Sequence, residues 1–250
     1  MISKSATILL LSLLLWTGCT SSDKSEETQG DDGVMSQRQE MPGEDESSNA
    51  DNTSEIAAID SSVIQILFLG DSITAGLGVN REEAFPVLVE QSLLDAGFSV
   101  NAIEGGVSGD TSTGGLNRMD WLLQNRVDIL FLELGGNDGL RGIDLNLTRS
   151  NLGAIIEVTR ERFPDVQVVV AGMIVPPNLG HEYTAEFTRI FPSVSEEYGT
   201  FLIPFIGTGL VGVDGMVQND GIHPTSLGHQ LIAETVYSEL VPILTDMQRD

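Results

Sequence analysis

Lysine is almost missing from this chain of 250 residues, and its absence bounds the possible partners. Lys4 and Lys24 are the only two, so arginine supplies all nine cations of residues 63–250. The same residues carry 25 acidic side chains, which gives them a net charge of −16. A phosphate backbone is repelled by such a surface rather than neutralised by it. The composition therefore excludes nucleic acid as a partner.

Cysteine and long apolar runs are equally scarce. Cys19 is the single cysteine, so no disulfide can form within the chain. The apolar run of residues 6–16 has 11 residues, whereas a membrane-spanning helix needs roughly 20. A positive start at Lys4, a short apolar run and Thr17-Gly18-Cys19 are typical of a signal peptide over residues 1–19. Cys19 resembles the lipidated cysteine of a bacterial lipoprotein, and ordinary secretion with an incidental cysteine is the alternative.

Large apolar side chains are nearly absent from residues 20–62. Twelve acidic residues accompany only Lys24 and Arg38 there, among many serines, glutamines and asparagines. Such a segment cannot bury enough apolar surface to offset the entropy lost on ordering. We therefore predict a disordered acidic tether, followed by one folded domain over residues 63–250. The expected location is outside the cytoplasm, anchored by lipid to the bacterial cell envelope on its periplasmic or outer side.

Apolar runs alternate with segments of helical periodicity throughout the domain, and no internal repeat is present. The strands are apolar on both faces, which is typical of a parallel sheet covered by helices on both sides. The predicted strands are 64–69, 98–103, 127–134, 166–175 and 200–204. The predicted helices are 82–96, 111–125, 145–163, 183–198 and 225–245.

Polar, glycine-rich segments follow the predicted strands at the edge where ligands bind in parallel sheets. They are "GDS" (70–72), "EGGVSGDTS" (104–112), "GGNDGLRG" (135–142) and "PPNLGHEY" (176–183). A further polar segment, "NDGIHP", occupies residues 219–224. This edge is therefore the expected functional site.

A serine hydroxyl needs a neighbouring base to become a nucleophile, and the domain has three histidines. His223 is the strongest candidate because Asp220, three residues earlier, can accept its Nδ1 proton and leave Nε2 free for Ser72. We expect His229 at the surface or the core edge, and His181 in a loop that contacts substrate. Taken singly, "GDS" is more often a plain turn, and Asp220 more often a helix cap.

Acyl transfer also needs donors for the oxyanion that develops on the substrate carbonyl. Gly109 and Asn137 follow the second and third strands, and the Ser72 N–H offers a third donor. The alternatives without a catalytic role are that Gly109 is a turn glycine and that Asn137 is an ordinary loop amide. The joint occurrence of all these residues at consecutive strand ends favours a hydrolytic site.

Four blocks together resemble the SGNH (GDSL) hydrolase family: Gly-Asp-Ser at 70–72, Gly109, Gly-x-Asn-Asp at 135–138 and Asp-x-x-His at 220–223. The surrounding segments resemble its branch of bacterial thioesterases, lysophospholipases and arylesterases. The resemblance covers residues 64–244 and implies a flavodoxin-like three-layer α/β/α sandwich with five parallel strands. It also implies Ser72 as nucleophile, His223 as base, Asp220 as its partner, and Ser72, Gly109 and Asn137 as the oxyanion hole, without metal or cofactor.

The predicted function is a monomeric serine esterase that hydrolyses small-molecule or lipid esters. Candidates for its substrate pocket are Asp71, Pro176, Pro177, Asn178 and Tyr183. A carbohydrate O-acetylesterase of the same fold remains an alternative, since only its pocket would differ. Two further alternatives are a non-catalytic surface binding module and a flavodoxin-like binder whose "DSITAGLG" loop holds phosphate, although the domain has no lysine for that role.

Overall fold

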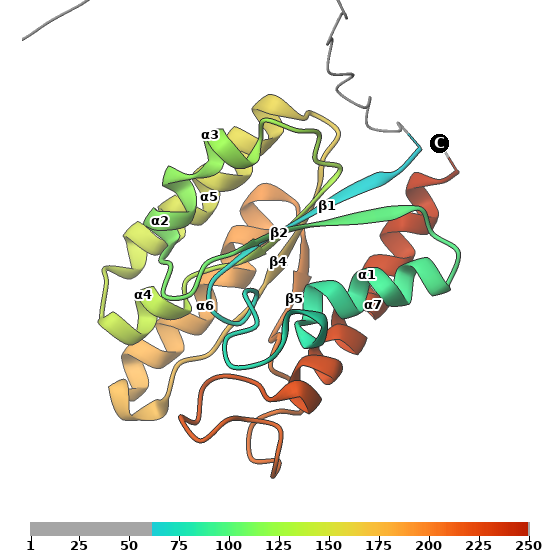
Figure 1. Cartoon of the computed structure of the whole chain (residues 1–250). Helices are drawn as coiled ribbons and strands as arrows, with labels where there is room; N and C mark the ends of the chain where they lie inside the picture. Colours follow the sequence, from blue (N-terminus) through green and yellow to red (C-terminus); the bar gives the residue numbers. More distant parts are fainter. Residues whose placement is uncertain (1–61, 250) are drawn as a thin grey trace, which may run out of the picture. The chain divides into compact units, whose positions relative to one another are not determined.

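Five parallel strands form one sheet in the order β2-β1-β3-β4-β5 (Figure 1). The computed structural model describes residues 62–249; the signal peptide and nearly all of the tether predicted above lie outside them. The strands are β1 (Ile64–Gly70), β2 (Val100–Gly106), β3 (Ile129–Glu133), β4 (Gln167–Ala171) and β5 (Phe201–Ile203). Every neighbouring pair is parallel, which confirms the predicted α/β sheet.

Helices cover both faces of the sheet (Figure 1). On one side α1 (Phe85–Asp95) packs against α7 (Ser226–Met247). On the other side α5 (Leu145–Arg162) packs against α2 (Ser112–Asn117), α3 (Met119–Leu122) and α6 (His181–Tyr198). Single 3₁₀ turns occupy η1 (Arg81–Glu83) and η2 (Pro177–Leu179). The predicted three-layer sandwich is confirmed, and no helix within residues 62–249 has the length and hydropathy to cross a membrane.

Aromatic side chains from β1, β3 and the start of α1 pack together in the core. The rings of Phe68, Phe85 and Phe131 lie 5.3–5.8 Å apart, and all three are fully buried. His229 in α7 is also fully buried, stacks on Phe85 and accepts a hydrogen bond from its backbone N–H at Nδ1. Burial lowers the pKa of His229 to about 4, so this histidine is a neutral core residue. The prediction that His229 lies at the surface or the core edge is wrong, because its side chain is buried within the core.

Three helical segments differ from the prediction, and glycine explains two of the differences. The helix expected over 111–125 divides at Arg118 into α2 and α3, because Gly114 and Gly115 weaken it and the Arg118 side chain is held elsewhere. A short helix, α4 (Gly136–Arg141), occupies a segment that the glycines made look like a loop. His181, expected in a loop, is the first residue of α6.

Strand register places the predicted site residues together. Gly70 of β1 lies beside Gly106 of β2 and Glu133 of β3. Ser72, Gly109 and Asn137 follow these residues by two, three and four positions. The edge of the sheet predicted from the sequence is therefore the place where they converge.

Candidate active site

Ser72 lies in a tight turn directly after β1. The turn is closed by hydrogen bonds from Ala75 N–H to the Asp71 carbonyl and from Leu77 N–H to the Ser72 carbonyl, 2.9 and 3.0 Å long. Gly70 is required at its start, because a Cβ there would lie 2.0 Å from the Thr74 hydroxyl oxygen. The strand and the close-packed turn therefore fix the Ser72 side chain, which is only 7% exposed as a residue.

His223 reaches Ser72 from the opposite end of the domain sequence. Its Nε2 lies 2.8 Å from Ser72 Oγ, and its Nδ1 lies 2.7 Å from Asp220 Oδ2. The other Asp220 oxygen accepts hydrogen bonds from the backbone N–H groups of Ile222 and His223. The bond to His223, with these two, lowers the pKa of Asp220 to about 2. The carboxylate is therefore charged at neutral pH and holds the imidazole with Nδ1–H toward itself.

Gln218, which the sequence did not single out, joins the serine loop to the histidine loop. Its side-chain amide donates to the Leu77 carbonyl at 2.7 Å and to the Pro224 carbonyl at 2.8 Å. Gly78 allows this approach, since a Cβ there would lie 2.4 Å from the Gln218 amide oxygen. The only signal in the sequence is its position just before "NDGIHP". The amide sets the distance between the two loops that bear Ser72 and His223.

The three donors predicted for the oxyanion differ in how free they are. Gly109 adopts a left-handed conformation (φ +81°). Within residues 62–249, the N–H groups of Ser72 and Gly109 donate to no other protein group. The Asn137 amide donates to Asp71 Oδ2 at 3.1 Å and to the Asp110 carbonyl at 2.9 Å. Two backbone donors are therefore available, and the side-chain donor is already engaged.

Two arginines hold the loop that contains Gly109 in place through hydrogen bonds. Arg118 donates to the Asp110 carboxylate at 2.8 Å and to the Gly70 carbonyl at 3.1 Å, which ties the Gly109 loop to the end of β1. Arg141 donates to the Gly109 carbonyl at 2.9 Å and approaches Asn137 Oδ1 at 3.4 Å. Arg141 lies within the polar segment 135–142 and Arg118 within the predicted helix 111–125, but the partners of both depend on tertiary contacts.

Two buried carboxyl groups lie beneath the serine turn. Asp71 is 3% exposed, and its oxygens accept from Ile73 N–H and the Asn137 amide. Glu133 at the end of β3 is fully buried, and its Oε2 accepts from the Thr74 hydroxyl at 2.7 Å. Burial raises the pKa of Asp71 to about 6 and that of Glu133 well above its usual range. Asp71 therefore faces the protein interior, where it orients Asn137 rather than lining an open pocket.

The remaining pocket candidates follow β4. Pro176 precedes η2, which contains Pro177 and the exposed Asn178. Tyr183 in α6 donates from its hydroxyl to the Gly139 carbonyl in α4 at 3.0 Å. These residues lie in the segment that follows β4 and in the first turn of α6, at the same edge of the sheet as Ser72.

The buried Glu133 gives a pH-dependent prediction for stability. A carboxyl whose pKa is raised on folding stabilises the protein below its unfolded pKa, near 4.5, and this stability is lost as pH rises through the folded pKa. Glu133→Gln removes that loss. We expect its free energy of unfolding to fall less steeply with pH than that of the wild type above pH 4.5, the slopes differing by up to about 1.4 kcal/mol per pH unit.

Thermal unfolding from pH 4 to 8 measures the two slopes. Exposed Glu161→Gln is the control for removing a carboxyl elsewhere. Parallel curves for Glu133→Gln and the wild type would contradict the raised pKa of Glu133.

Known proteins are similar to this chain over most of the domain. Residues 68–231 match the model of the GDSL-like Lipase/Acylhydrolase family. Esterase TesA of Pseudomonas aeruginosa is 37% identical over 180 residues, which cover 72% of this chain and 89% of TesA. Thioesterase 1/protease 1/lysophospholipase L1 of Escherichia coli is 32% identical over 180 residues, 72% of this chain and 84% of the relative.

Solved structures agree with the sequence relatives. A crystal structure of TesA matches with a TM-score of 0.68 and 36% identity, over 71% of this chain and 98% of the other. Esterase EstA from Pseudoalteromonas also gives 0.68, with 31% identity over 72% and 98%. The predicted fold and the predicted class of ester hydrolase are confirmed. The chain belongs to the GDSL-like Lipase/Acylhydrolase family.

Proposed function

We propose that this enzyme hydrolyses carboxylic esters through an acyl-enzyme on Ser72. One observation carries the assignment: the continuous contact from Ser72 Oγ to His223 Nε2 (2.8 Å) and from His223 Nδ1 to Asp220 (2.7 Å). A hydroxyl, an imidazole and a carboxylate in this order are the arrangement that activates a serine.

The steps follow from which atoms face one another. His223 Nε2 takes the Ser72 proton while Oγ attacks the carbonyl carbon of the ester. The tetrahedral intermediate collapses, its bond to the leaving oxygen breaks, and His223 gives the proton to the departing alcohol. Water then attacks the acyl-enzyme with His223 again as base, which releases the acid and restores Ser72. Asp220 stabilises the imidazolium formed in both halves.

The oxyanion is assigned to the N–H groups of Ser72 and Gly109 and to the Asn137 amide. The two backbone donors can bind the oxyanion without breaking another hydrogen bond, because they have no protein acceptor within residues 62–249. Asn137 contributes only by sharing or giving up one of its bonds to Asp71 and Asp110. The backbone pair is therefore expected to provide the larger share of the stabilisation.

The substrates we propose are aryl esters, short- to medium-chain acyl esters and lysophospholipids, with thioesters as a further class. Relatives named arylesterase, esterase and thioesterase/lysophospholipase support this range. The pocket wall is assigned to the loop of Pro176, Pro177 and Asn178 and to Tyr183.

Hydrolysis of p-nitrophenyl esters from acetyl to palmitoyl tests the proposal. We expect turnover with an optimum at short to medium chains. We also expect a phosphonate inhibitor to form a stoichiometric adduct, which mass spectrometry maps to the peptide containing Ser72. Turnover of the acetyl ester alone would replace this function with a carbohydrate O-acetylesterase. Absence of both turnover and adduct would leave a binding module.

We further propose that the chain is exported and held at the envelope by lipid on Cys19. The 11-residue apolar run before this cysteine and the polar segment after it support the assignment. Cys19→Ser is expected to move the protein from the membrane pellet to the soluble fraction after detergent-free lysis. If the variant still sediments with membranes, the lipid is not what holds it.

A further inference from the structure

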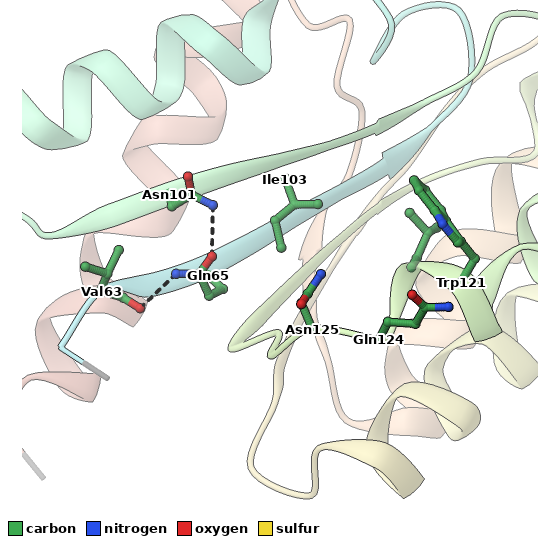
Figure 2. A pocket seen from close by; sticks show the side chains of 8 residues that line it. Val63, Gln65, Asn101, Ile103, Trp121, Gln124 and Asn125 are labelled. Carbon is green, nitrogen blue, oxygen red and sulfur yellow. Dashed lines mark hydrogen bonds between the residues drawn. The ribbon is translucent and has the colours of Figure 1, made fainter. Parts of the chain in front are cut away.

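A groove of about 460 Å³ lies at the far end of β1 from Ser72 (Figure 2). Four amide side chains line it: Gln65, Asn101, Gln124 and Asn125. Beside them stands Trp121, which is 66% exposed. Gln65 precedes Ser72 by seven residues of mostly extended chain, so roughly 20 Å separates this groove from the nucleophile. The groove is therefore no part of the site described above.

The topology explains why the groove is open. Gln65 pairs in register with Asn101 on β2, so residues 65, 101 and 103 present their side chains to one face of the sheet. β2 is an edge strand, and the helices that follow it, α2 and α3, have only six and four residues. They leave this end of the sheet face uncovered, with Ile103 partly buried as its apolar floor.

The amides of the groove are arranged rather than scattered. Gln65 is 5% exposed, donates to the Val63 carbonyl and accepts from the Asn101 amide at 2.8 Å, as the dashed lines of Figure 2 show. The pair fixes the Asn101 amide, whose carbonyl oxygen accepts no hydrogen bond from residues 62–249. Within the described part of the chain, the Gln124 and Asn125 side chains bond to no protein group. The groove thus offers both donors and acceptors to a ligand.

Charge is absent from the lining, in contrast to the rest of the domain. None of the described residues that line the groove is ionisable, although residues 63–250 carry a net charge of −16. Neutral amides beside an exposed indole suit a ligand whose hydroxyls both donate and accept and whose ring presents an apolar face.

We propose that this groove is a binding site for a neutral carbohydrate. Its sugar ring packs on Trp121, and its hydroxyls bond to Asn101, Gln124 and Asn125. An added peptide strand fits less well, because Ala102 N–H on the open edge of β2 already donates to the Glu90 carboxylate at 2.7 Å. The proposal is independent of the ester chemistry at Ser72.

Affinity electrophoresis of the full chain in gels containing neutral polysaccharides tests the site. The panel is a β-glucan, a glucomannan and starch, with anionic alginate as contrast. We expect at least one neutral polymer to retard the protein, and the retardation to persist from low salt to about 0.5 M. Trp121→Ala should weaken binding about tenfold or more, and Asn101→Ala a few-fold.

Matched variants separate this site from the remainder of the protein. Phe201→Ala removes an exposed aromatic side chain at the opposite sheet edge, and Ser72→Ala removes the proposed nucleophile. Both should be retarded like the wild type, and melting temperatures establish that every variant is folded. Failure of all neutral polymers to retard the wild type overturns the proposal, as does retardation that survives Trp121→Ala or is lost in Ser72→Ala.

Fluorescence distinguishes a sugar from the chain's own N-terminal residues. The chain has two tryptophans, and Trp16 lies in the predicted signal peptide, so Trp121 is the only tryptophan that emits once that segment is removed. We expect emission typical of an exposed indole, and a saturable blue shift on adding the pentasaccharide of the retarding polymer. Emission that is already blue-shifted and insensitive to sugar would mean that the protein covers its own groove, and would overturn the proposal.

Discussion

Ser72→Ala is expected to lower kcat/KM for p-nitrophenyl butyrate by about 10⁴-fold or more. The alanine leaves His223 with no hydroxyl to deprotonate, so no acyl-enzyme forms and only the donors that bind the oxyanion still assist water. Ser72 is 7% exposed, and within residues 62–249 its hydroxyl bonds only to His223, so folding should be unaffected. The measurement is initial rate against substrate concentration, with the melting temperature alongside.

The control for Ser72→Ala is Ser238→Ala, which removes an exposed serine hydroxyl from α7. It should hydrolyse the ester at the wild-type rate. If Ser72→Ala keeps more than a few per cent of wild-type kcat/KM, the serine is not the nucleophile, and the Ser72–His223 contact has another purpose.

Asp220→Asn is expected to lower kcat/KM by roughly 10³-fold while the protein stays folded. The asparagine oxygen can keep the two hydrogen bonds from Ile222 and His223 N–H, so the turn is preserved. Its NH₂ group, however, faces His223 Nδ1 and selects the tautomer whose proton lies on Nε2, toward Ser72. That imidazole cannot accept the serine proton.

Asp220→Ala provides the comparison for this prediction. This variant also removes the side-chain oxygen that accepts from the backbone N–H groups of Ile222 and His223. It should therefore lower the melting temperature, whereas Asp220→Asn should not. Steady-state kinetics and calorimetry on both variants separate the two effects. Wild-type activity in Asp220→Asn would show that His223 needs no carboxylate to fix its tautomer.

The parallel sheet and the Asp220–His223 pair could be predicted from the sequence because both depend on local patterns. Short apolar runs such as 64–69, which alternate with helical segments, favour buried strands, and the segments that follow such strands lie at one edge of a parallel sheet. Asp220 and His223 are three residues apart, so their contact needs only a turn. These features can be predicted without knowing which elements pack against one another.

The supporting contacts were out of reach because they join residues far apart in sequence. Gln218 bonds to Leu77, 141 positions away, and nothing in either segment announces the pair. Glu133 lies in the apolar run 127–134, and a carboxyl buried there needs a hydrogen-bond partner, but the sequence does not say which residue provides it. The segment of α4 misled for a different reason: Gly139 packs where a Cβ would lie 2.6 Å from Phe187 and Val175, so glycine there serves packing, not a loop.

The separation of Ser72 and His223 by 151 positions also governs when in its life the protein acquires activity. A nascent chain that ends within the first four strands contains the proposed nucleophile and oxyanion donors but lacks His223, the proposed base. Products that end before residue 223 are therefore expected to be inert, and so is any molecule whose His223 loop has not yet docked beside Ser72. Hydrolysis is then expected only from a chain that has been synthesised and folded through residue 223.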